Sequence, residues 1–451
     1  MQKLYGGLGY FYCQVAPVEN LDPEKRVADL TVHIQENDVC YLGKLEFSGN
    51  TFTKDHVIRR EWFLREGKRL NLNALEDSVR RMKQLGLVTM DKMPEIKPDA
   101  KDPTLININA EVKEINRQSI NFNVGYSGYD GFFVAAGYST QNFLGMGEAF
   151  TLNMQTGTRT KNYQVAFTEP YLFNLPANAG INVFKTTAEY PYLYTQRSDG
   201  FNLSSSARFW RYFGASLTYS FEHIEISDVD EDFIASNPYY AAYYSEGKRR
   251  VSSLIPTLSY TTVDSPIFPR SGTKYQVSFR YSGGPLGGDV NLQKLELEYV
   301  KFQPIWAHHV LGFHAVYNKV RSFGGKGIPY YERIFLGGER SIRGFDIYEI
   351  GPRDSDGTVY GGNKAFFLNF EYQIPLNDNF AFVFFHDVGN SYDNKAKISL
   401  KNLYSSSGLE LKVFVPMLNV PFRLIFAYNP RLLEPKDKHF VFRFAVGPSF
   451  Y

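Results

Sequence analysis

The chain has 451 residues, too many for one ordinary hydrophobic core, so its length predicts either several domains or one very large architecture. Its 49 Lys and Arg residues nearly balance its 47 Asp and Glu residues, giving a formal net charge of +2 without a basic block, which excludes nucleic acid as the main partner. No apolar run approaches the ~18 residues of a spanning helix, so a helical membrane protein is excluded too. A large soluble β-protein or a transmembrane β-barrel remains, because alternating strands hide their apolar face from a hydropathy average.

The opening segment reads as the end of a domain. Residues 27–34 alternate as in a strand, but no earlier helices and strands complete a core around them. Residues 1–10 lack the charged and apolar regions of a secretory signal. We therefore expect that further residues precede this sequence.

The cysteines of the chain, Cys13 and Cys40, both lie near its start. Two cysteines are too few for a disulfide framework. They can pair in an oxidising compartment or remain buried thiols, and the sequence leaves both readings open.

Residues 41–116 change period from element to element, which predicts a small α+β module. A strand over 41–47 and a tight turn lead to a first helix. Thr53 is its expected cap, and the helix is expected to run through Phe63.

The second helix of this module has Asn73 as its expected cap, Glu76 three residues later, and Gly86 as its left-handed end. Strands at 87–90 and 105–112 then complete a β-α-α-β-β unit. The sheet of this unit buries the apolar stripe of both helices, and its open edge is a hypothetical site for an extended peptide.

From residue 118 onward the period is two, and segments of about ten alternating residues are separated by Gly, Asn, Asp, Pro and Ser. The expected strands are sixteen: 118–127, 132–139, 148–156, 161–169, 178–189, 200–211, 213–225, 250–262, 273–283, 290–302, 308–321, 363–374, 379–389, 404–415, 422–429 and 439–447. Strands of this length cross a bilayer when tilted, and their connections tend to alternate between short and long. The fold class is therefore mainly β, with a 16-stranded antiparallel transmembrane β-barrel after the α+β module.

The expected strand 363–374 has two distinct faces. Apolar side chains, from Phe366 to Tyr372, alternate with a set that contains Glu371. The same parity on the next strand puts Asp387 inside the barrel and His386 outside, near the strand end at the level of the lipid headgroups.

Motifs for an enzyme, a cofactor or a metal are not found. His308 and His314 share a predicted strand face, but six residues separate them by about 20 Å, so they and His309 cannot share one metal. No nucleophile stands at a recognised spacing from a base, and we predict no catalytic residue and no cofactor.

The stretch between the eleventh and twelfth strands contains Ile342, Arg343, Gly344 and Phe345 within a segment that is charged, Gly-rich and aromatic together. Here the chain resembles the BamA family of outer-membrane protein assembly factors, whose sixth external loop folds into the barrel lumen with an Arg-Gly-aromatic tip. The resemblance extends to short motifs elsewhere: 49–53, 59–61, 112–114, 361–363, 384–390 and 442–447.

The resemblance implies three parts. Residues 1–36 are the remnant of a preceding POTRA domain, residues 41–116 are a POTRA domain, and residues 118–451 are the barrel. It also implies a bacterial outer-membrane protein with its POTRA domain in the periplasm.

Arg343 inside a lumen would be a partly desolvated cation and would need a carboxylate. The inward parity offers Glu371 and Asp387 on adjacent strands, and the family resemblance selects the same two positions. The alternative is that Arg343 is a solvated loop residue and that these carboxylates line a wet pore.

The seam between the first and last strands is the expected lateral gate, because an assembly machine without ATP has to draw on strand pairing. Gly447 and Pro448 are poor ladder formers at this seam. The gate residues that we expect are Ile120, Phe122, Val124, Phe440, Phe442, Phe444, Val446 and Gly447.

By resemblance, the function is to receive unfolded outer-membrane proteins through POTRA domains and to fold them into the lipid bilayer at this gate. Accessory outer-membrane lipoproteins are further expected partners. The main alternative is a two-partner secretion transporter that exports a protein through the lumen, and a simple porin is a second one.

Overall fold

The computed structural model describes the chain except for residues 23–26, 117, 128–129, 176, 191–193, 211, 230–246, 266–268, 355–356, 378, 416–419, 434–436 and 448–451. The chain divides into two compact units, one made of residues 1–119 with 139–150 and the other of 120–138 with 151–451. Among the described residues, no helix is both long enough and apolar enough to cross a membrane.

The first unit opens with a short helix, α1 (Gln2–Gly7), and an antiparallel hairpin of β1 (Gln14–Asp22) and β2 (Val27–Gln35). Cys13 and Cys40 are buried free thiols, which decides the question that the sequence left open.

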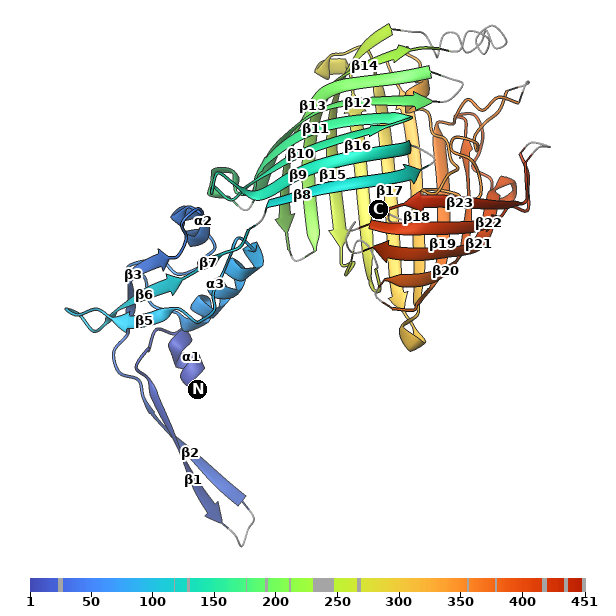
Figure 1. Cartoon of the computed structure of the whole chain (residues 1–451). Coiled ribbons are helices and arrows are strands. Elements are labelled where there is room, and N and C mark those ends of the chain that lie inside the picture. Colours follow the sequence, from blue (N-terminus) through green and yellow to red (C-terminus); the bar gives the residue numbers. More distant parts are fainter. Residues whose placement is uncertain are drawn as a thin grey trace. The chain divides into compact units, whose positions relative to one another are not determined.

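The α+β module of this unit has a sheet in the order β3, β6, β5, with β3 parallel and β5 antiparallel to β6 (Figure 1). Its remaining strands, β4 and β7, pair with each other. The elements are β3 (Tyr41–Ser48), α2 (Asp55–Arg59), α3 (Leu72–Leu85), β4 (Val88–Thr89), β5 (Glu95–Pro98), β6 (Leu105–Glu111) and β7 (Lys113–Glu114).

Helix α3 buries the stripe that the sequence predicts, and it ends at Gly86 in the left-handed conformation, with φ +73°. The predicted cap is wrong. Asn71, not Asn73, is the cap, because its backbone is extended and its side chain accepts a hydrogen bond from the N–H of Ala74 at 2.9 Å. Glu76 forms an ion pair with Lys3 instead of closing a capping box.

Helix α2 is shorter than predicted, and Thr53 is not its cap. The N-cap is Lys54, and the helix ends at Arg59 because the next turns close with i to i+3 bonds, including that from the N–H of Trp62 to the carbonyl of Arg59. Trp62 is buried in the module's core, whereas Phe63 is exposed.

Glu114 fixes the turn before α2. Its carboxylate accepts hydrogen bonds from the Thr51 hydroxyl and from the backbone N–H groups of Phe52 and Thr53. Partial burial raises the pKa of Glu114, but these hydrogen bonds outweigh it and lower that pKa overall. Gly49 precedes the turn with φ +91°, where a Cβ would lie 2.0 Å from the carbonyl oxygen of Val112.

The expected sheet of the module also needs correction. The strand predicted at 87–90 does not join it, since β4 pairs with β7 outside it. Leu87, Val88 and Met90 are nevertheless buried in the module's core, which explains their apolar pattern. The third sheet strand is β5, which the sequence analysis missed.

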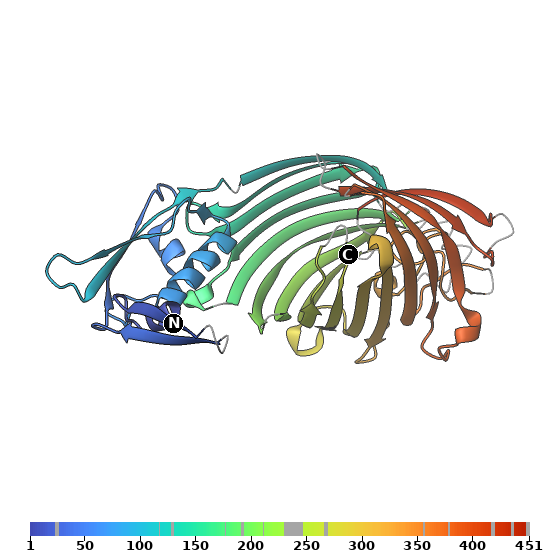
Figure 2. The ribbon, with the colours of Figure 1, turned by 90° about the horizontal axis from the view of Figure 1, so that it is seen from below.

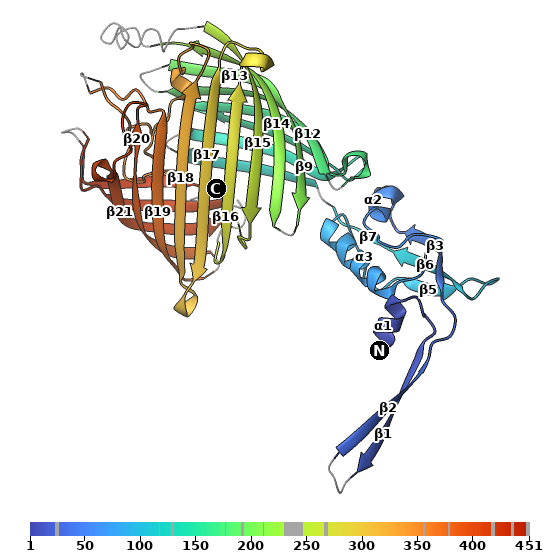
Figure 3. The same cartoon turned by 180° about the vertical axis from the view of Figure 1, so that it is seen from behind.

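The second unit is built on one antiparallel sheet, which has 16 strands within the described residues and runs in sequence order from β8 to β23 (Figure 1). Figure 2 shows the sheet curving round on itself, and Figure 3 shows the wall of β15 to β21 from behind. The strands are β8 (Gln118–Ser127), β9 (Gly131–Phe143), β10 (Glu148–Gly157), β11 (Thr160–Glu169), β12 (Ala177–Tyr190), β13 (Tyr194–Phe209), β14 (Phe213–Ser227), β15 (Gly247–Thr261), β16 (Gly272–Ser282), β17 (Leu292–Pro304), β18 (Val310–Ser322), β19 (Lys364–Pro375), β20 (Phe380–Tyr392), β21 (Tyr404–Val415), β22 (Val420–Tyr428) and β23 (Phe440–Val446).

The predicted fold class is thereby confirmed, and each predicted strand has its counterpart. The largest differences are β13, which starts six residues earlier at Tyr194, and β9, which ends four residues later at Phe143.

The two faces of β19 and β20 follow the predicted parity, with Glu371 and Asp387 buried and Phe370 and Phe384 exposed. The position of His386 differs from the prediction. It faces outward but lies in the middle of β20, and its Nδ1 pairs with the Ser407 hydroxyl of β21 at 2.8 Å. This partner on the neighbouring strand pairs with the imidazole.

Candidate functional site

The connection between β18 and β19, residues 323–363, is called the lumen loop below. Its backbone makes pairs of its own, with Leu336 opposite Ile350 and Ile334 opposite Gly362. Apolar side chains of the loop and of the barrel wall share one cluster: Ile328, Tyr330, Ile334, Leu336, Ile342, Phe345 and Ile350 with Val251, Leu292, Val320 and Phe367. The loop is therefore packed against the inside of the barrel and is not a solvated excursion.

The tip of the lumen loop is a tight turn. Gly337 and Gly338 have positive φ, and the N–H of Gly338 bonds to the carbonyl of Phe345 at 2.9 Å. Gly344 has no room for a side chain, because a Cβ there would lie 2.0 Å from Oδ1 of Asn429. This turn delivers Arg343 to the wall.

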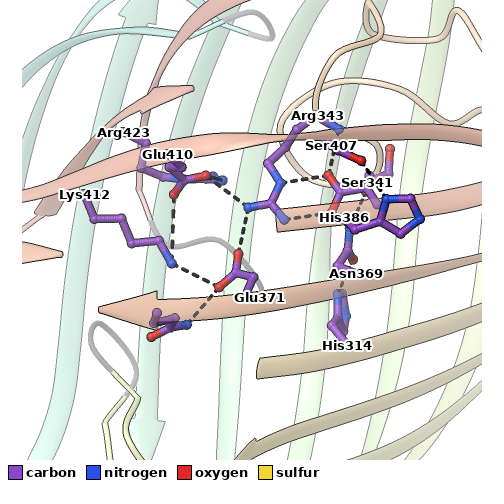
Figure 4. A network of polar contacts seen from close by, with 12 residues as sticks. His314, Ser341, Arg343, Asn369, Glu371, His386, Ser407, Glu410, Lys412 and Arg423 are labelled. Atoms are coloured by element: carbon purple, nitrogen blue, oxygen red, sulfur yellow. Dashed lines mark hydrogen bonds and ion pairs between the residues drawn. The ribbon is translucent and has the colours of Figure 1, made fainter. Parts of the chain in front are cut away.

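Arg343 is 2% exposed and contacts three carboxylates, as Figure 4 shows in part. Its Nε and Nη2 donate to the two oxygens of Asp387 at 2.8 and 2.7 Å, a bidentate pair, and its own backbone N–H donates to Asp387 at 3.0 Å. Its Nη1 donates to Glu371 at 2.7 Å and to Glu410 at 3.1 Å. The guanidinium also lies 3.9 Å from the centre of the Phe385 ring.

Glu410, Lys412 and Arg423 are further charged residues of this site that the sequence did not predict. Arg423 of β22 holds both oxygens of Glu410, at 2.8 and 2.9 Å, and Lys412 lies 3.3 Å from Glu371. The site thus has three cations and three carboxylates, and all six side chains are buried. The cations are Arg343, Lys412 and Arg423, and the carboxylates are Glu371, Asp387 and Glu410. The missed signal was the parity of 404–415, which puts Glu410 and Lys412 on the inner face.

Asn369 connects Arg343 to the rest of the wall. Its Nδ2 donates to Asp387 at 2.8 Å and to the carbonyl of Ser341 in the loop at 2.6 Å. Its Oδ1 lies 3.0 Å from Nδ1 of His314, whose other nitrogen is 3.3 Å from Glu298. His314 is thus a buried hydrogen-bonding residue of the wall.

A second charged contact holds the beginning of the lumen loop. Glu332 is buried and lies 2.9 Å from Nη2 of Arg280 on β16, and Arg280 lies 3.5 Å from Glu222 on β14. Charged contacts therefore attach the loop to two parts of the wall. Glu332 contacts Arg280 of β16, and Arg343 contacts carboxylates of β19, β20 and β21.

The expected gate residues lie on the two edge strands of the sheet. On β8, Ile120, Phe122 and Val124 are exposed, with Phe122 at 71%. On β23, Phe440 and Phe442 are exposed, the former at 76%.

The remaining gate residues, Phe444 and Val446, are partly buried, and Gly447 follows them with φ +114°. Pro448 lies outside the described residues. Over the described part of the sheet no ladder joins β8 to β23, so each of these strands has one edge without a strand partner.

A buried arginine on an inward loop, together with a barrel sheet and a preceding α+β module, defines a class of protein. The Omp85 superfamily domain matches residues 142–450, and a POTRA-type domain described as a surface antigen variable number repeat matches residues 40–124. The chain belongs to the Omp85 superfamily.

Individual proteins of known sequence or structure are similar to this chain. An outer membrane protein assembly factor BamA from Nitratidesulfovibrio vulgaris is 26% identical over all of this chain, which spans 56% of that relative's length. The crystal structure of BamA from Haemophilus ducreyi lacking POTRA domains 1–3 has a TM-score of 0.83 at 22% identity, over 99% of this chain and 91% of that one. CdiB from Acinetobacter baumannii shares the fold more distantly, with a TM-score of 0.56 at 14% identity over 97% of this chain and 78% of that one.

Proposed function

We propose that this chain is the barrel and adjoining periplasmic part of an outer-membrane β-barrel assembly factor. It receives unfolded outer-membrane proteins through POTRA domains and folds them into the lipid bilayer by pairing their strands at a lateral gate between β8 and β23. Its place is the bacterial outer membrane, with the POTRA domain in the periplasm. The division into a POTRA remnant (1–36), a POTRA domain (41–116) and a barrel (118–451) remains part of this proposal.

The observation that carries the proposal is the pair of edge strands without a ladder between them over the described residues. A backbone N–H or C=O without a partner in lipid costs several kcal/mol. An incoming strand that bonds to such an edge recovers this free energy, which is strand addition inside a membrane. The edge is thus the part of the chain that can drive insertion without ATP.

The lumen loop has a supporting role in this proposal. Arg343 ties it to β19, β20 and β21 through Glu371, Asp387 and Glu410. A loop fastened in this way stiffens the wall at β19 to β21, which β22 separates from the edge strand β23, and leaves the movement to β8 and β23. Ile342, Gly344 and Phe345 shape the tip that brings Arg343 there.

The partners follow from the same proposal. The clients are unfolded outer-membrane proteins, and the bilayer is their destination. Accessory outer-membrane lipoproteins are further proposed partners of the POTRA domain.

The alternative is a two-partner secretion transporter that exports a protein through the lumen. The apolar packing of the lumen loop against Leu292 and Phe367 favours the assembly factor, because a translocation path has to be cleared of this packing. The distant fold match to CdiB fits either reading.

The test is reconstitution of the full-length protein that contains this chain into liposomes, with an unfolded eight-stranded barrel as client. We expect faster client folding, read as the heat-modifiable band on a gel, than in liposomes with a porin of similar size. No acceleration, combined with passage of a secreted protein into the liposomes, would establish the transporter instead.

A further inference from the structure

The tip of the lumen loop contacts the last strand of the barrel as well as the fixed wall. Arg443 of β23 shares the inner face of its strand with the buried Ala445, whereas Phe440 and Phe442 are exposed on the outer face. Its Nη2 lies 2.6 Å from Oδ1 of Asp346 and 3.3 Å from the carbonyl oxygen of Gly344. Both acceptors belong to the loop, one and three residues after Arg343.

The same carbonyl of Gly344 also accepts a bond from Asn429, which follows β22, at 2.9 Å. The last hairpin therefore reaches the tip from both of its strands. Since Gly344 has no space for a Cβ beside Asn429, this approach is close and depends on where the tip lies. A displacement of the tip has to break these bonds or move the hairpin.

A cavity of about 510 Å³ lies next to this contact. The loop contributes Phe345, Asp346 and Glu349 to its lining, and the last hairpin contributes Lys438 and Arg443. Because the packing there is incomplete, the hydrogen bonds and the ion pair of Arg443 are the specific link between loop and strand, and the strand has room to shift when they break.

We propose that Arg443 is a positioning residue that couples the seating of the lumen loop to the position of β23, the strand on one side of the gate. Arg343 binds the loop to the wall, and three residues later Asp346 binds it to the edge strand β23. The loop thereby transmits its seated or released state to the gate. This inference rests on the proposed function, because it assigns a regulator to the proposed gate.

The experiment measures the distance between spin labels on Phe122→Cys in β8 and Phe442→Cys in β23, without a client, in the full-length protein with Cys13→Ala and Cys40→Ala. Arg443→Met keeps the length of the side chain and removes its bonds. Arg343→Ala releases the loop from the wall. Lys438→Met, which removes a nearby cation from the cavity lining, is the matched control.

We expect Arg443→Met and Arg343→Ala each to shift the distance distribution, and the double variant to shift it less than the sum. A coupling of about threefold or more in the ratio of the two distance populations is the expected size for groups linked in this way. Lys438→Met leaves the distribution unchanged. Additive shifts, or no shift with Arg443→Met, would overturn the coupling.

Heat-modifiable gel mobility shows whether each variant folds. If Arg443→Met does not fold, two further variants test the same contact. Asp346→Asn removes the ion pair by changing its exposed partner in the loop, so that the sequence of β23 stays unchanged. This variant should reproduce the shift of Arg443→Met. Arg443→Asp combined with Asp346→Arg should restore the parental distribution, and its failure to do so would contradict the coupling.

The outcome is separate from that of the proposed function. If the parental protein does not accelerate client folding, the proposed function fails, but the distance measurement still reports whether Arg443 links loop and strand. If the protein accelerates folding and the shifts are additive, only the coupling fails.

Discussion

The wall beneath the lumen loop and the two edge strands of the barrel differ in how completely their polar groups are paired. Strands β19 and β20 pair along their length from Lys364 with Tyr392 to Pro375 with Ala381. Strand β23 is seven residues long and pairs on one side with β22, while no ladder covers its other side among the described residues. One barrel thus combines a part of the wall that buried charges cross-link with two edge strands that no ladder joins over the described residues.

Closing the edge should have the largest effect. A disulfide can join the two edges in the background without the native cysteines. One cysteine replaces Ile120, Phe122 or Val124 of β8, and the other replaces Phe440, Phe442 or Phe444 of β23. We expect loss of most client folding activity under oxidation and its return on reduction, because no edge is then available. Full activity with a cross-link formed quantitatively would remove the difference between wall and edge.

Loosening the wall at its centre comes second. Arg343→Ala leaves Glu371, Asp387 and Glu410 buried without their shared cation, which costs about 3–5 kcal/mol for a buried pair that loses one member. We expect protease cleavage within the lumen loop and weaker assembly activity. Arg340→Ala, at an exposed residue of the same loop, should leave both unchanged. An intact loop in Arg343→Ala would show that the apolar packing and the contacts of Glu332 and Asp346 seat it without Arg343.

Loss of Arg423, which pairs with Glu410, should destabilise the barrel less than loss of Arg343. Arg423→Met unbalances Glu410 but leaves the bonds of Arg343 to Asp387 and Glu371 in place. We expect a loss of about 1–3 kcal/mol in the free energy of unfolding, measured by urea titration of the folded band. Because the two side chains are in contact, the double change with Glu410→Gln should cost less than the sum of the single changes, and strict additivity would argue against their pairing.

The contact of Glu332 with Arg280 tests whether the loop has a second independent attachment. Glu332→Gln should expose the beginning of the loop to protease by a few-fold while cleavage near Arg343 stays at the parental rate, because the two contacts lie on different strands. Equal exposure of both sites would indicate a single cooperative loop.

The smallest effect is one of pH. Burial raises the pKa of Glu349 in the loop to about 7 from its ordinary 4.5; Asp346 and Asp437 also raise it by charge repulsion, while a backbone hydrogen bond at Asp346 and the charge of Arg443 oppose the rise. A carboxyl whose pKa is raised in the folded state stabilises that state below its ordinary pKa and loses this contribution as the pH rises through 7. The loop should therefore resist protease better at about pH 6 than at about pH 8. Glu349→Gln should abolish this difference, and a parental slope in that variant would assign it to another group.

The barrel strands were predictable because a half-buried strand alternates with period two, and this signal survives where the register between strands is unknown. The same parity placed Glu371 and Asp387 inside. Helix caps were harder to predict, since Asn71 and Asn73 have the same chemistry and the extended backbone of Asn71 decides between them. Strand β5, Glu95–Pro98, was missed because it is short, charged and ends in proline.

Of the charged site, only Arg343, Glu371 and Asp387 were predicted from the sequence. Glu410 and Arg423 lie on strands whose register with β20 the sequence does not specify, so their approach to Arg343 became visible only with the sheet assembled. The contact of Arg443 with Asp346 joins residues 97 positions apart, and no local pattern predicts it.

The balance of the buried charges also bears on how this barrel itself matures. Without Arg343, Lys412 and Arg423 face Glu371, Asp387 and Glu410, so this cluster of the wall has one more negative than positive charge until the loop docks. A barrel that has formed its strands without seating the loop therefore keeps an uncompensated carboxylate in this buried cluster, and docking of Arg343 removes that cost.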